Sequence, residues 1–298
     1  MTTPSGAGAS VPPTPAGEPE KKKSRAGRDL PAAIGSAVLL LVAIALCLAT
    51  LDGFPFVFLV TAAIGAGVWE LWRALRTRGI NLAFEPLLVS VAAMLFGAWF
   101  GGAPALATAL AVTALAAMLW RLRSGVDGFV RDATASVFTA VYLPFLAGFV
   151  VLLLNGEDGV WRVMVFILVT IASDIGGYAA GVLLGRHPMA PVISPKKSWE
   201  GFAGSAASCM VVGWLTVDYL LDGRWWVGVL LGAVAVVTAT MGDLCESVIK
   251  RDLGIKDMSQ IVPGHGGIMD RLDSLLATVA PTWLLLYYLV DVSPTAGF

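Results

Sequence analysis

Residues 160–184 read VWRVMVFILVTIASDIGGYAAGVLL, a run in which only Arg162 and Asp174 carry charge. As a helix this run would be about 37 Å long, which is enough to cross the roughly 30 Å of hydrocarbon in a bilayer. Comparable runs recur along the chain, where 57% of the 298 residues are hydrophobic and only 14% are charged. A soluble domain normally carries about 25% charged residues. The sequence therefore predicts an all-α, polytopic integral membrane protein.

About nine transmembrane helices are expected, because that many apolar runs have the length of a membrane span. Residues 1–30 are rich in Pro, Gly, Ala and Ser and then basic, a composition typical of a disordered tail. We therefore expect a basic tail (1–30), N-terminal transmembrane helices (31–154) and a C-terminal transmembrane region (155–298). The expected spans are 31–51, 54–72, 84–101, 104–120, 134–154, 160–184, 203–221, 226–242 and 274–291.

The positive charges are segregated along the chain. If the N-terminus is cytoplasmic, all of the 20 Lys and Arg except Arg162 and Arg224 fall in the tail or in inner connections. Because inner loops are enriched in Lys and Arg, this distribution predicts a cytoplasmic N-terminus. The two longest inner connections are 185–202 and 243–273, so any chemistry is expected at the inner face. The net charge of −1 gives no indication of a nucleic-acid partner.

The segment 243–273 carries acidic and basic side chains at helical spacing. Asp243, Glu246 or Ser247, and Lys250 would share one face of a helix, because side chains three and four residues apart are neighbours. The alternative to a functional site is a solvated basic loop, whose charges pair with one another or with anionic lipid heads.

Two further acidic residues, Asp270 and Asp273, stand where the apolar run resumes and a helix must begin. Ionisable groups at such a position are costly and usually functional. Carboxylates beside Lys and Arg suit a hard cation that bridges protein and phosphate oxygens. His265 lies between glycines that allow a ligand to approach the backbone closely, so it is a candidate phosphate contact or proton handler. Its alternative role is that of a plain hydrogen-bonding group.

The segment 185–202 contains Ser-Pro-Lys-Lys-Ser-Trp-Glu-Gly at 194–201. Ser194 is expected to cap a helix that has Pro195 at its first position. Amides at that N-terminus, the Lys196 and Lys197 ammonium groups and the Ser198 hydroxyl would suit a polyphosphate. The alternative is ordinary anchoring charge at the inner membrane surface.

Asp174 lies inside an otherwise apolar span, on the order of 12 Å from the end of that span. A carboxylate at that depth needs a partner, and its default interpretation is functional. The glycines that follow Asp174 also permit close helix packing, which is a sufficient structural reason for them. Glu70 is a weaker candidate, because Arg73 at i+3 would pair with it.

At these positions the chain resembles the phosphatidate cytidylyltransferases, also called CDP-diacylglycerol synthases. The resemblance covers about 173–274 and is specific, because long, charge-dense patterns rarely arise by chance in a membrane chain. Family members often have Asp-Thr-Gly-Ala-Tyr where this chain has Asp174-Ile-Gly-Gly-Tyr178. The matching blocks are Ser173-Asp174, the octapeptide at 194–201, Ser247-Val-Ile-Lys250-Arg251, Lys256-Asp257 and His265-Gly-Gly-Ile-Met-Asp270-Arg271-Leu-Asp273.

The resemblance implies attack of phosphatidate on the α-phosphorus of CTP, giving CDP-diacylglycerol and diphosphate. It also implies Mg²⁺ or a paired-metal centre, held by Asp243, Asp270 and, by extension, Asp273. The implied catalytic residues are Asp243, Lys250, Arg251, His265, Asp270 and Arg271. The implied substrate-binding residues are Asp174, Ser194, Lys196, Lys197, Ser198 and Glu200.

The expected location follows from where the two substrates meet. Phosphatidate presents its head group at the inner leaflet and CTP comes from the cytosol, so we expect a multi-pass protein of the inner (plasma) membrane whose site faces the cytoplasm. The expected partners are CTP, phosphatidate and membrane lipids, with a homodimer as an open option and no nucleic acid.

Two other functions fit parts of the pattern. The first is a CTP-dependent kinase of polyprenols or other lipid alcohols, which would also need a nucleotide site at the inner face. The second is a secondary transporter that uses Asp174 and Glu70 as coupling groups. Transporters place such groups near the midplane, whereas the polar residues here gather at one face, which argues against transport.

Overall fold

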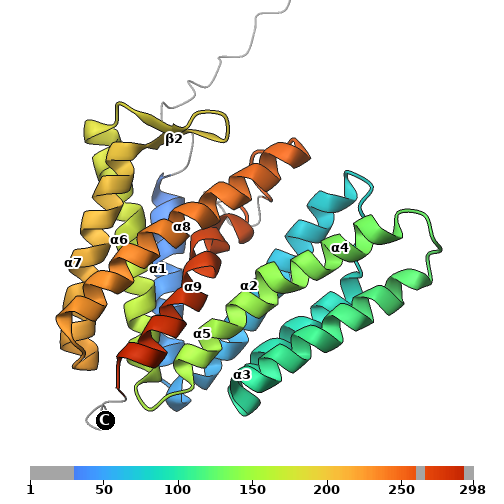
Figure 1. Ribbon diagram of the computed structural model, residues 1–298, viewed down its shortest axis with the longest axis horizontal. Helices are drawn as coiled ribbons and strands as arrows, with labels where there is room; N and C mark the ends of the chain where they lie inside the picture. Colours follow the sequence, from blue (N-terminus) through green and yellow to red (C-terminus); the bar gives the residue numbers. More distant parts are fainter. Residues whose placement is uncertain (1–29, 260–265, 292–298) are drawn as a thin grey trace, which may run out of the picture.

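The computed structural model describes residues 30–259 and 266–291 and, for residues 30–34, 36 and 37, the backbone only. The chain forms a bundle of helices with one two-stranded hairpin at one end (Figure 1). Its elements are α1 (Leu30–Leu48), η1 (Leu51–Gly53), α2 (Phe54–Arg76), α3 (Phe84–Leu122), α4 (Phe129–Ala140), η2 (Val141–Phe145), α5 (Leu146–Leu154), α6 (Gly159–Leu184), β1 (Pro188–Ala190), β2 (Ser194–Ser198), α7 (Trp199–Leu221), α8 (Trp225–Leu253) and α9 (Met269–Leu289).

Most of these helices are long and apolar. Among the described residues, seven helical stretches could cross a membrane by length and composition, and α1 adds a shorter apolar stretch at Val38–Ala49. The predicted all-α, polytopic membrane architecture is confirmed at this level. The count of nine crossings and the side on which the N-terminus lies stay predictions. The seven stretches are Leu51–Arg76, Phe84–Leu122, Phe129–Leu154, Gly159–Leu184, Trp199–Leu221, Trp225–Leu253 and Met269–Leu289.

Helix α3 is broken in its middle, at the position where the sequence predicts a turn between two spans. Gly102 has φ +64° and ψ −157°, a backbone conformation that residues with a Cβ rarely adopt. The chain then folds back, so a Cβ built on Gly97 would lie only 3.8 Å from the Cβ of Ala105. The two halves of α3 therefore lie side by side as a helical hairpin (Figure 1).

The span 129–154 contains a π-helical turn, η2, between α4 and α5. Pro144 lies inside this turn, and proline has no N–H to donate while its ring clashes with the carbonyl four residues earlier. A single wider turn absorbs this misfit without ending the helix. The stretch Phe129–Leu154 consequently remains one continuous span.

Helices α6 to α9 pack against one another in chain order, through glycine-rich crossings. A Cβ on Gly213 of α7 would lie 2.3 Å from the carbonyl oxygen of Gly228 on α8. A Cβ on Gly176 of α6 would lie 2.7 Å from the carbonyl oxygen of Gly204 on α7. Close backbone approach favours van der Waals packing, which replaces the hydrophobic effect between helices in lipid. The glycines after Asp174 thus have the packing role that the sequence allows.

The end of the bundle opposite the hairpin is held by a buried ion pair. Arg162 Nε donates to Asp158 Oδ1 at 2.6 Å, and both side chains are almost fully buried. The same guanidinium donates to the carbonyl oxygens of Leu286 at 2.8 Å and Val290 at 3.1 Å. The Leu286 carbonyl also accepts the Val290 amide at 3.3 Å, so Arg162 adds a second donor there and binds the Val290 carbonyl just beyond the end of α9.

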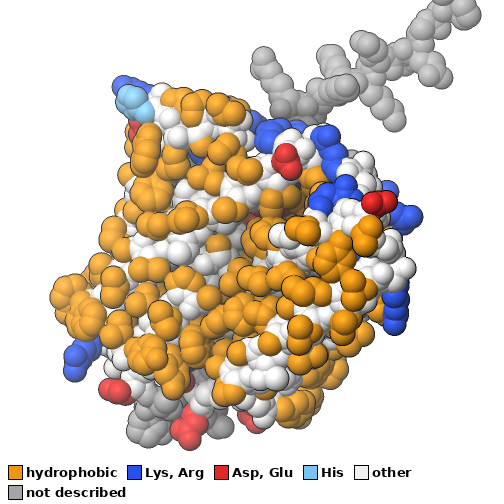
Figure 2. Space-filling model, turned by 45° about the vertical axis from the view of Figure 1, so that its right-hand side comes forward, with side chains coloured by type: hydrophobic (Ala, Val, Ile, Leu, Met, Phe, Trp, Pro, Cys, Tyr) orange, Lys and Arg blue, Asp and Glu red, His pale blue; other side chains and the backbone are white. Residues whose placement is uncertain are grey.

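Basic side chains gather at the other end of the bundle. The last turns of α2, α3 and α8 carry arginine or lysine, and the hairpin carries Lys196 and Lys197. Figure 2 shows Lys and Arg mainly along one edge of a face that is otherwise largely apolar. Such a distribution is typical of a membrane protein whose polar chemistry lies at one bilayer surface.

Candidate active site

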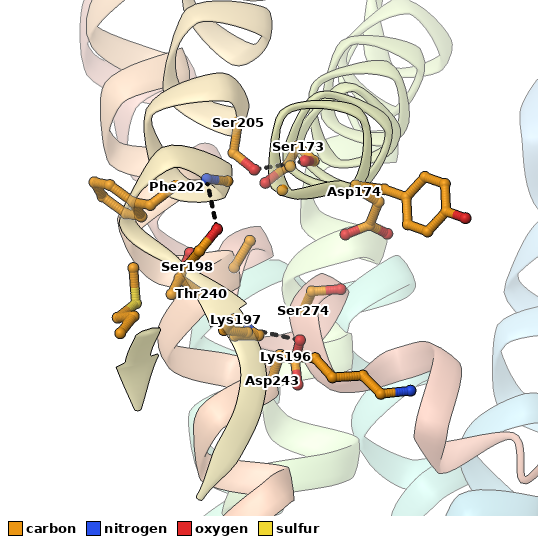
Figure 3. Close-up of a pocket in the computed structure, with 16 residues that line it drawn as sticks. Ser173, Asp174, Lys196, Lys197, Ser198, Phe202, Ser205, Thr240, Asp243 and Ser274 are labelled. Carbon is orange, nitrogen blue, oxygen red and sulfur yellow. Dashed lines mark hydrogen bonds and ion pairs between the residues drawn. The ribbon is translucent and has the colours of Figure 1, made fainter. Parts of the chain in front are cut away.

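A cavity of about 280 Å³ opens at the basic end of the bundle, between α6, the hairpin, α7 and α8, with a contribution from α9 (Figure 3). Several of its walls are glycines, so the backbone of α6 and α7 lies close to any ligand. The lining residues are Ser173, Asp174, Gly177, Tyr178, Gly181, Met189, Lys196, Lys197, Ser198, Gly201, Phe202, Ser205, Ala239, Thr240, Asp243 and Ser274.

Lys197 and Asp243 meet inside this cavity. Lys197 Nζ lies 2.6 Å from Asp243 Oδ2, which joins the end of β2 to α8 (Figure 3). Asp243 also accepts a hydrogen bond from Ser247 one helical turn later, at 3.3 Å. Both charged side chains remain partly exposed, at 24% and 41%, so a ligand can reach them. Two residues 46 positions apart in sequence, predicted separately, are thus brought together.

The hairpin corrects one prediction made from the sequence. Ser194 and Pro195 begin the strand β2, not a helix, and Ser194 pairs with Ala190 of β1. The helix N-cap is Ser198, whose hydroxyl accepts a hydrogen bond from the Gly201 amide at 3.1 Å. Ser198 lines the cavity as predicted, whereas Ser194 is absent from its lining. The misassignment arises because Pro195 fits the edge of a two-stranded sheet as well as a first helical turn.

Glu200 has partners that explain its position without a ligand. Its carboxylate accepts hydrogen bonds from the backbone amides of Arg186 at 3.1 Å and His187 at 3.2 Å, and it pairs with His187 Nδ1 at 2.5 Å. These contacts close the base of the hairpin, because Arg186 and His187 immediately precede β1. Glu200 does not line the cavity, so its assignment to substrate binding stays a prediction.

A second charged group lies where α8 meets the start of α9. Lys250 Nζ is 2.5 Å from Glu246 Oε2 and 2.8 Å from Asp270 Oδ1. The other oxygen of Asp270 accepts the backbone amides of Gly267 at 2.8 Å and Met258 at 3.1 Å. The predicted helix from Asp243 onward is confirmed, since α8 continues to Leu253 and brings these side chains onto neighbouring turns.

The two charged groups are linked through the crossing of α8 and α9. A Cβ on Gly242 would lie 2.4 Å from the carbonyl oxygen of Asp273, so the backbones touch next to Asp243. Asp273 is buried, and the negative charges of Asp243 and Asp174 both act on its carboxylate. Ser274 donates its amide to Asp273 Oδ1 at 2.7 Å. Three carboxylates thus concentrate negative charge beside the cavity.

Within residues 30–259 and 266–291, no three His, Cys, Asp or Glu side chains form a ready-made metal site. The predicted ligands Asp243, Asp270 and Asp273 lie instead on two adjoining helices, and two of them are paired with lysines. A carboxylate offers about four lone-pair positions, so these hydrogen bonds leave Asp243 and Asp270 able to bind a cation. The metal assignment stays a prediction.

The remaining predicted residues lie around this centre. Arg251 Nε donates to the carbonyl oxygen of Ile193 at 3.5 Å, which connects α8 to the turn of the hairpin. Arg271 is exposed on the first turn of α9, and its positive charge acts on Asp174. Asp174 and Lys196 both line the cavity. His265 lies outside the described residues.

Sequence reasoning gave Glu70 the wrong partner. Glu70 of α2 is completely buried and accepts the backbone amides of Ile268 at 2.9 Å and Met269 at 2.8 Å, together with the Ser259 hydroxyl. Arg73, the expected partner, lies instead over the Trp69 ring at 5.6 Å. The signal in the sequence was a carboxylate inside an apolar run; its partners, almost 200 residues away, could not be inferred from local spacing.

Comparison with known proteins extends the likeness beyond the motifs. The model of the cytidylyltransferase family matches residues 32–289. The phosphatidate cytidylyltransferase of Mycobacterium bovis is 40% identical over 284 residues, which cover 90% of this chain and 92% of that protein. The Mycobacterium leprae protein of the same name is 41% identical over 284 residues (89% and 90%). The Synechocystis protein of that name is 32% identical over 278 residues (84% and 92%). The similarity therefore includes the N-terminal helices.

Proposed function

This chain belongs to the cytidylyltransferase family, and from that premise we propose that the charged cavity between α6, α7 and α8 is where CTP and phosphatidate react. The chain is a nucleotidyltransferase of phospholipid synthesis, a phosphatidate cytidylyltransferase. A phosphate oxygen of phosphatidate attacks the α-phosphorus of CTP, and the bond from that phosphorus to the diphosphate breaks. The products are CDP-diacylglycerol and diphosphate.

The pairing of Lys197 with Asp243 carries the assignment of the site. It unites the hairpin block with the α8 block inside one cavity, beside the Asp174 carboxylate on α6. Three sequence blocks, those around Asp174, Lys197 and Asp243, therefore line the same cavity. Phosphoryl-type transfer depends mainly on alignment and charge neutralisation, and such a convergence of charges can provide both.

Cations are required because both reactants are anions. Lys196 and Lys197 line the cavity and can bind the phosphates of CTP. Lys250, fixed between Glu246 and Asp270, and the exposed Arg251 and Arg271 add positive charge on the side of α8 and α9. Since phosphatidate is already ionised at neutral pH, no strong base is needed to activate it.

The donor set suits a magnesium ion. Glu246 Oε1 is buried without a hydrogen-bond partner, next to the Lys250 ammonium that binds both Glu246 and Asp270, so the region has a carboxylate oxygen that its lysine does not satisfy. We propose that Asp243, Asp270 and Asp273 hold Mg²⁺, as one ion or a pair. When bound, the ion would neutralise phosphate charge. Oxygen ligands of this kind are those that Mg²⁺ prefers.

The proposed orientation places this end of the bundle in the cytoplasm. The hairpin and the C-terminal ends of α2 and α8 lie at one end of the molecule (Figure 1), and each of these elements carries two basic side chains there. The positive-inside rule then assigns that end to the cytoplasmic side of the cell membrane. CTP would enter from the cytosol, while phosphatidate would arrive from the inner leaflet.

The proposed function is tested by an acceptor comparison. Purified protein in mixed micelles with labelled CTP and Mg²⁺ should form CDP-diacylglycerol from phosphatidate and should transfer nothing to a polyprenol. Label from the γ-phosphate should leave as diphosphate. Phosphorylated polyprenol would show a lipid-alcohol kinase instead, and no nucleotide turnover with either acceptor would refute the proposed function.

Replacing Lys197 with Gln should weaken CTP binding. The substitution removes a cation that lines the cavity, and charge-assisted hydrogen bonds are worth about 1.5–3 kcal/mol, so the KM for CTP should rise roughly tenfold or more. Steady-state rates at varied CTP measure this change. Arg76→Gln, which removes an exposed cation over Trp72 away from the cavity, is the matched control and should leave this KM unchanged. Equal KM values for both variants would exclude Lys197 from the CTP site.

A further inference from the structure

Glu70 is a buried carboxylate in a span of the N-terminal half, away from the lining of the cavity. None of its side chain is exposed, and an ionisable group inside a membrane-spanning helix is costly unless it is well paired. A buried carboxylate at such a position is usually functional, because it makes hydrogen bonds that an apolar residue cannot make. The contacts of Glu70 show what that is.

Both oxygens of Glu70 bind the first turn of α9. Oε1 accepts the Ile268 amide at 2.9 Å, and Oε2 accepts the Met269 amide at 2.8 Å. Ile268, the N-cap residue of α9, provides no side-chain cap of its own. Because the first amides of a helix lack partners within it, α9 takes its cap from α2. The Ser259 hydroxyl donates to the same carboxylate.

The turn that Glu70 binds also holds Asp270. Three successive amides are divided between two carboxylates: Gly267 donates to Asp270, whereas Ile268 and Met269 donate to Glu70. A Cβ on Gly267 would lie 2.8 Å from Glu70 Oε2 and 3.0 Å from Asp270 Oδ2. The position of Glu70 therefore determines the position of the turn, and the turn determines how Asp270 faces Lys250.

We propose that Glu70 is a positioning residue for the transferase site: it fixes the start of α9 so that Asp270 and Lys250 keep their places. This inference rests on the proposed function of the site. It gives the N-terminal half a part in positioning the site, since α2 supplies a contact that α9 cannot make for itself. Glu70 does not line the cavity, and its proposed effect on the site is transmitted by the backbone at the start of α9.

The test replaces Glu70 with Gln in the full-length protein. The glutamine side chain has one acceptor oxygen, and its NH₂ group would face a backbone N–H. One of the two hydrogen bonds from the backbone amides of Ile268 and Met269 must therefore be lost. We expect kcat to fall about tenfold and the Mg²⁺ concentration for half-maximal rate to rise severalfold, while the KM for phosphatidate stays within twofold. Hydrogen–deuterium exchange should accelerate in peptides covering 266–272 and remain unchanged in α6 and α7.

Asp158→Asn is the matched control, because it also removes a buried carboxylate that stabilises α9. Asp158 pairs with Arg162, which binds the opposite end of that helix at Leu286 and Val290. This variant should lower thermal stability in detergent without changing the Mg²⁺ requirement. If both variants lose activity only in proportion to their loss of folded protein, Glu70 has a purely structural role and the inference fails.

A second variant keeps the question open to refutation if Glu70→Gln does not fold. Gly267→Ala leaves every charge in place but inserts a methyl group between Glu70 and Asp270. It should show the same fall in kcat and the same increase in Mg²⁺ requirement. If Gly267→Ala has a normal Mg²⁺ requirement and synthesises CDP-diacylglycerol at the wild-type rate, the role of Glu70 is overturned and the proposed function stays intact. Absence of synthesis by the wild type would overturn the function itself.

Discussion

Asp270→Asn should lower the rate of CDP-diacylglycerol formation by roughly 10²–10³-fold, the range found when a preorganised electrostatic group is removed from an active site. The carboxylate is bonded on both oxygens, to Lys250 at 2.8 Å on one side and to the amides of Gly267 and Met258 on the other. Asparagine preserves the shape but places an NH₂ group against one of these donors. It also removes the charge that holds Lys250 and that we assign to Mg²⁺.

The effect of Asp270→Asn should appear in kcat. Initial rates of labelled CDP-lipid formation at saturating CTP and Mg²⁺ measure it. Asp252→Asn is the matched control, since Asp252 is an exposed carboxylate in the last turn of the same helix that carries Lys250. It should retain wild-type activity. Retention of more than about a tenth of wild-type kcat by folded Asp270→Asn would contradict an electrostatic role of the size given above.

Gly242→Val should reduce activity by about a hundredfold through geometry alone. The backbones of α8 and α9 touch at this residue, where a Cβ would lie 2.4 Å from Asp273 O and 2.7 Å from the Ala277 Cβ. Insertion of a branched side chain must separate the two helices, and overpacking of this kind costs about 1–3 kcal/mol in stability. A displacement of about 1 Å between reacting groups can itself cost about 10²-fold in rate. The separation falls directly beside Asp243.

Gly65→Val is the control for Gly242→Val. Gly65 lies in α2, another membrane span, and a Cβ there has no atom within 4 Å. Activity and thermal midpoint in detergent should match the wild type for this variant, because the new side chain enters open space. Comparable losses in both variants would mean that valine disturbs these helices generally and that the close crossing is not what the site depends on.

The helical membrane architecture could be predicted because it rests on one-dimensional properties. In lipid every backbone N–H and C=O of a span must be hydrogen-bonded within the protein, so a long apolar run has to be a helix. The break at Gly102 is indicated in the sequence by a Gly-Gly pair. The prediction that Glu246 and Lys250 share a helix face is also confirmed, because i, i+4 neighbours follow from the helix itself. These are properties of a residue and its nearest neighbours.

What could not be predicted depends on tertiary contacts that the local pattern does not specify. The hairpin around Ser194 is held by Glu200 from the following helix, so the local signal of Ser-Pro pointed to a cap that does not form. Glu70 looked like half of a local ion pair with Arg73, although it binds α9. For Glu70 a nearby candidate partner competed with a distant one, and spacing alone favours the nearer, whereas for Ser194 two local structures, a helix cap and a strand, competed.

The contacts at the two ends of α9 both bear on the dipole of this helix. Aligned peptide dipoles give a helix about half a positive charge at its N-terminus and half a negative charge at its C-terminus. Here the first end meets the Glu70 anion and the second meets the Arg162 cation, so each terminal charge is countered inside the bundle. Because both counter-charges are buried, dissolved ions cannot screen them effectively. The axial position of α9 should therefore be insensitive to ionic strength, even where nucleotide binding beside its N-terminus is not.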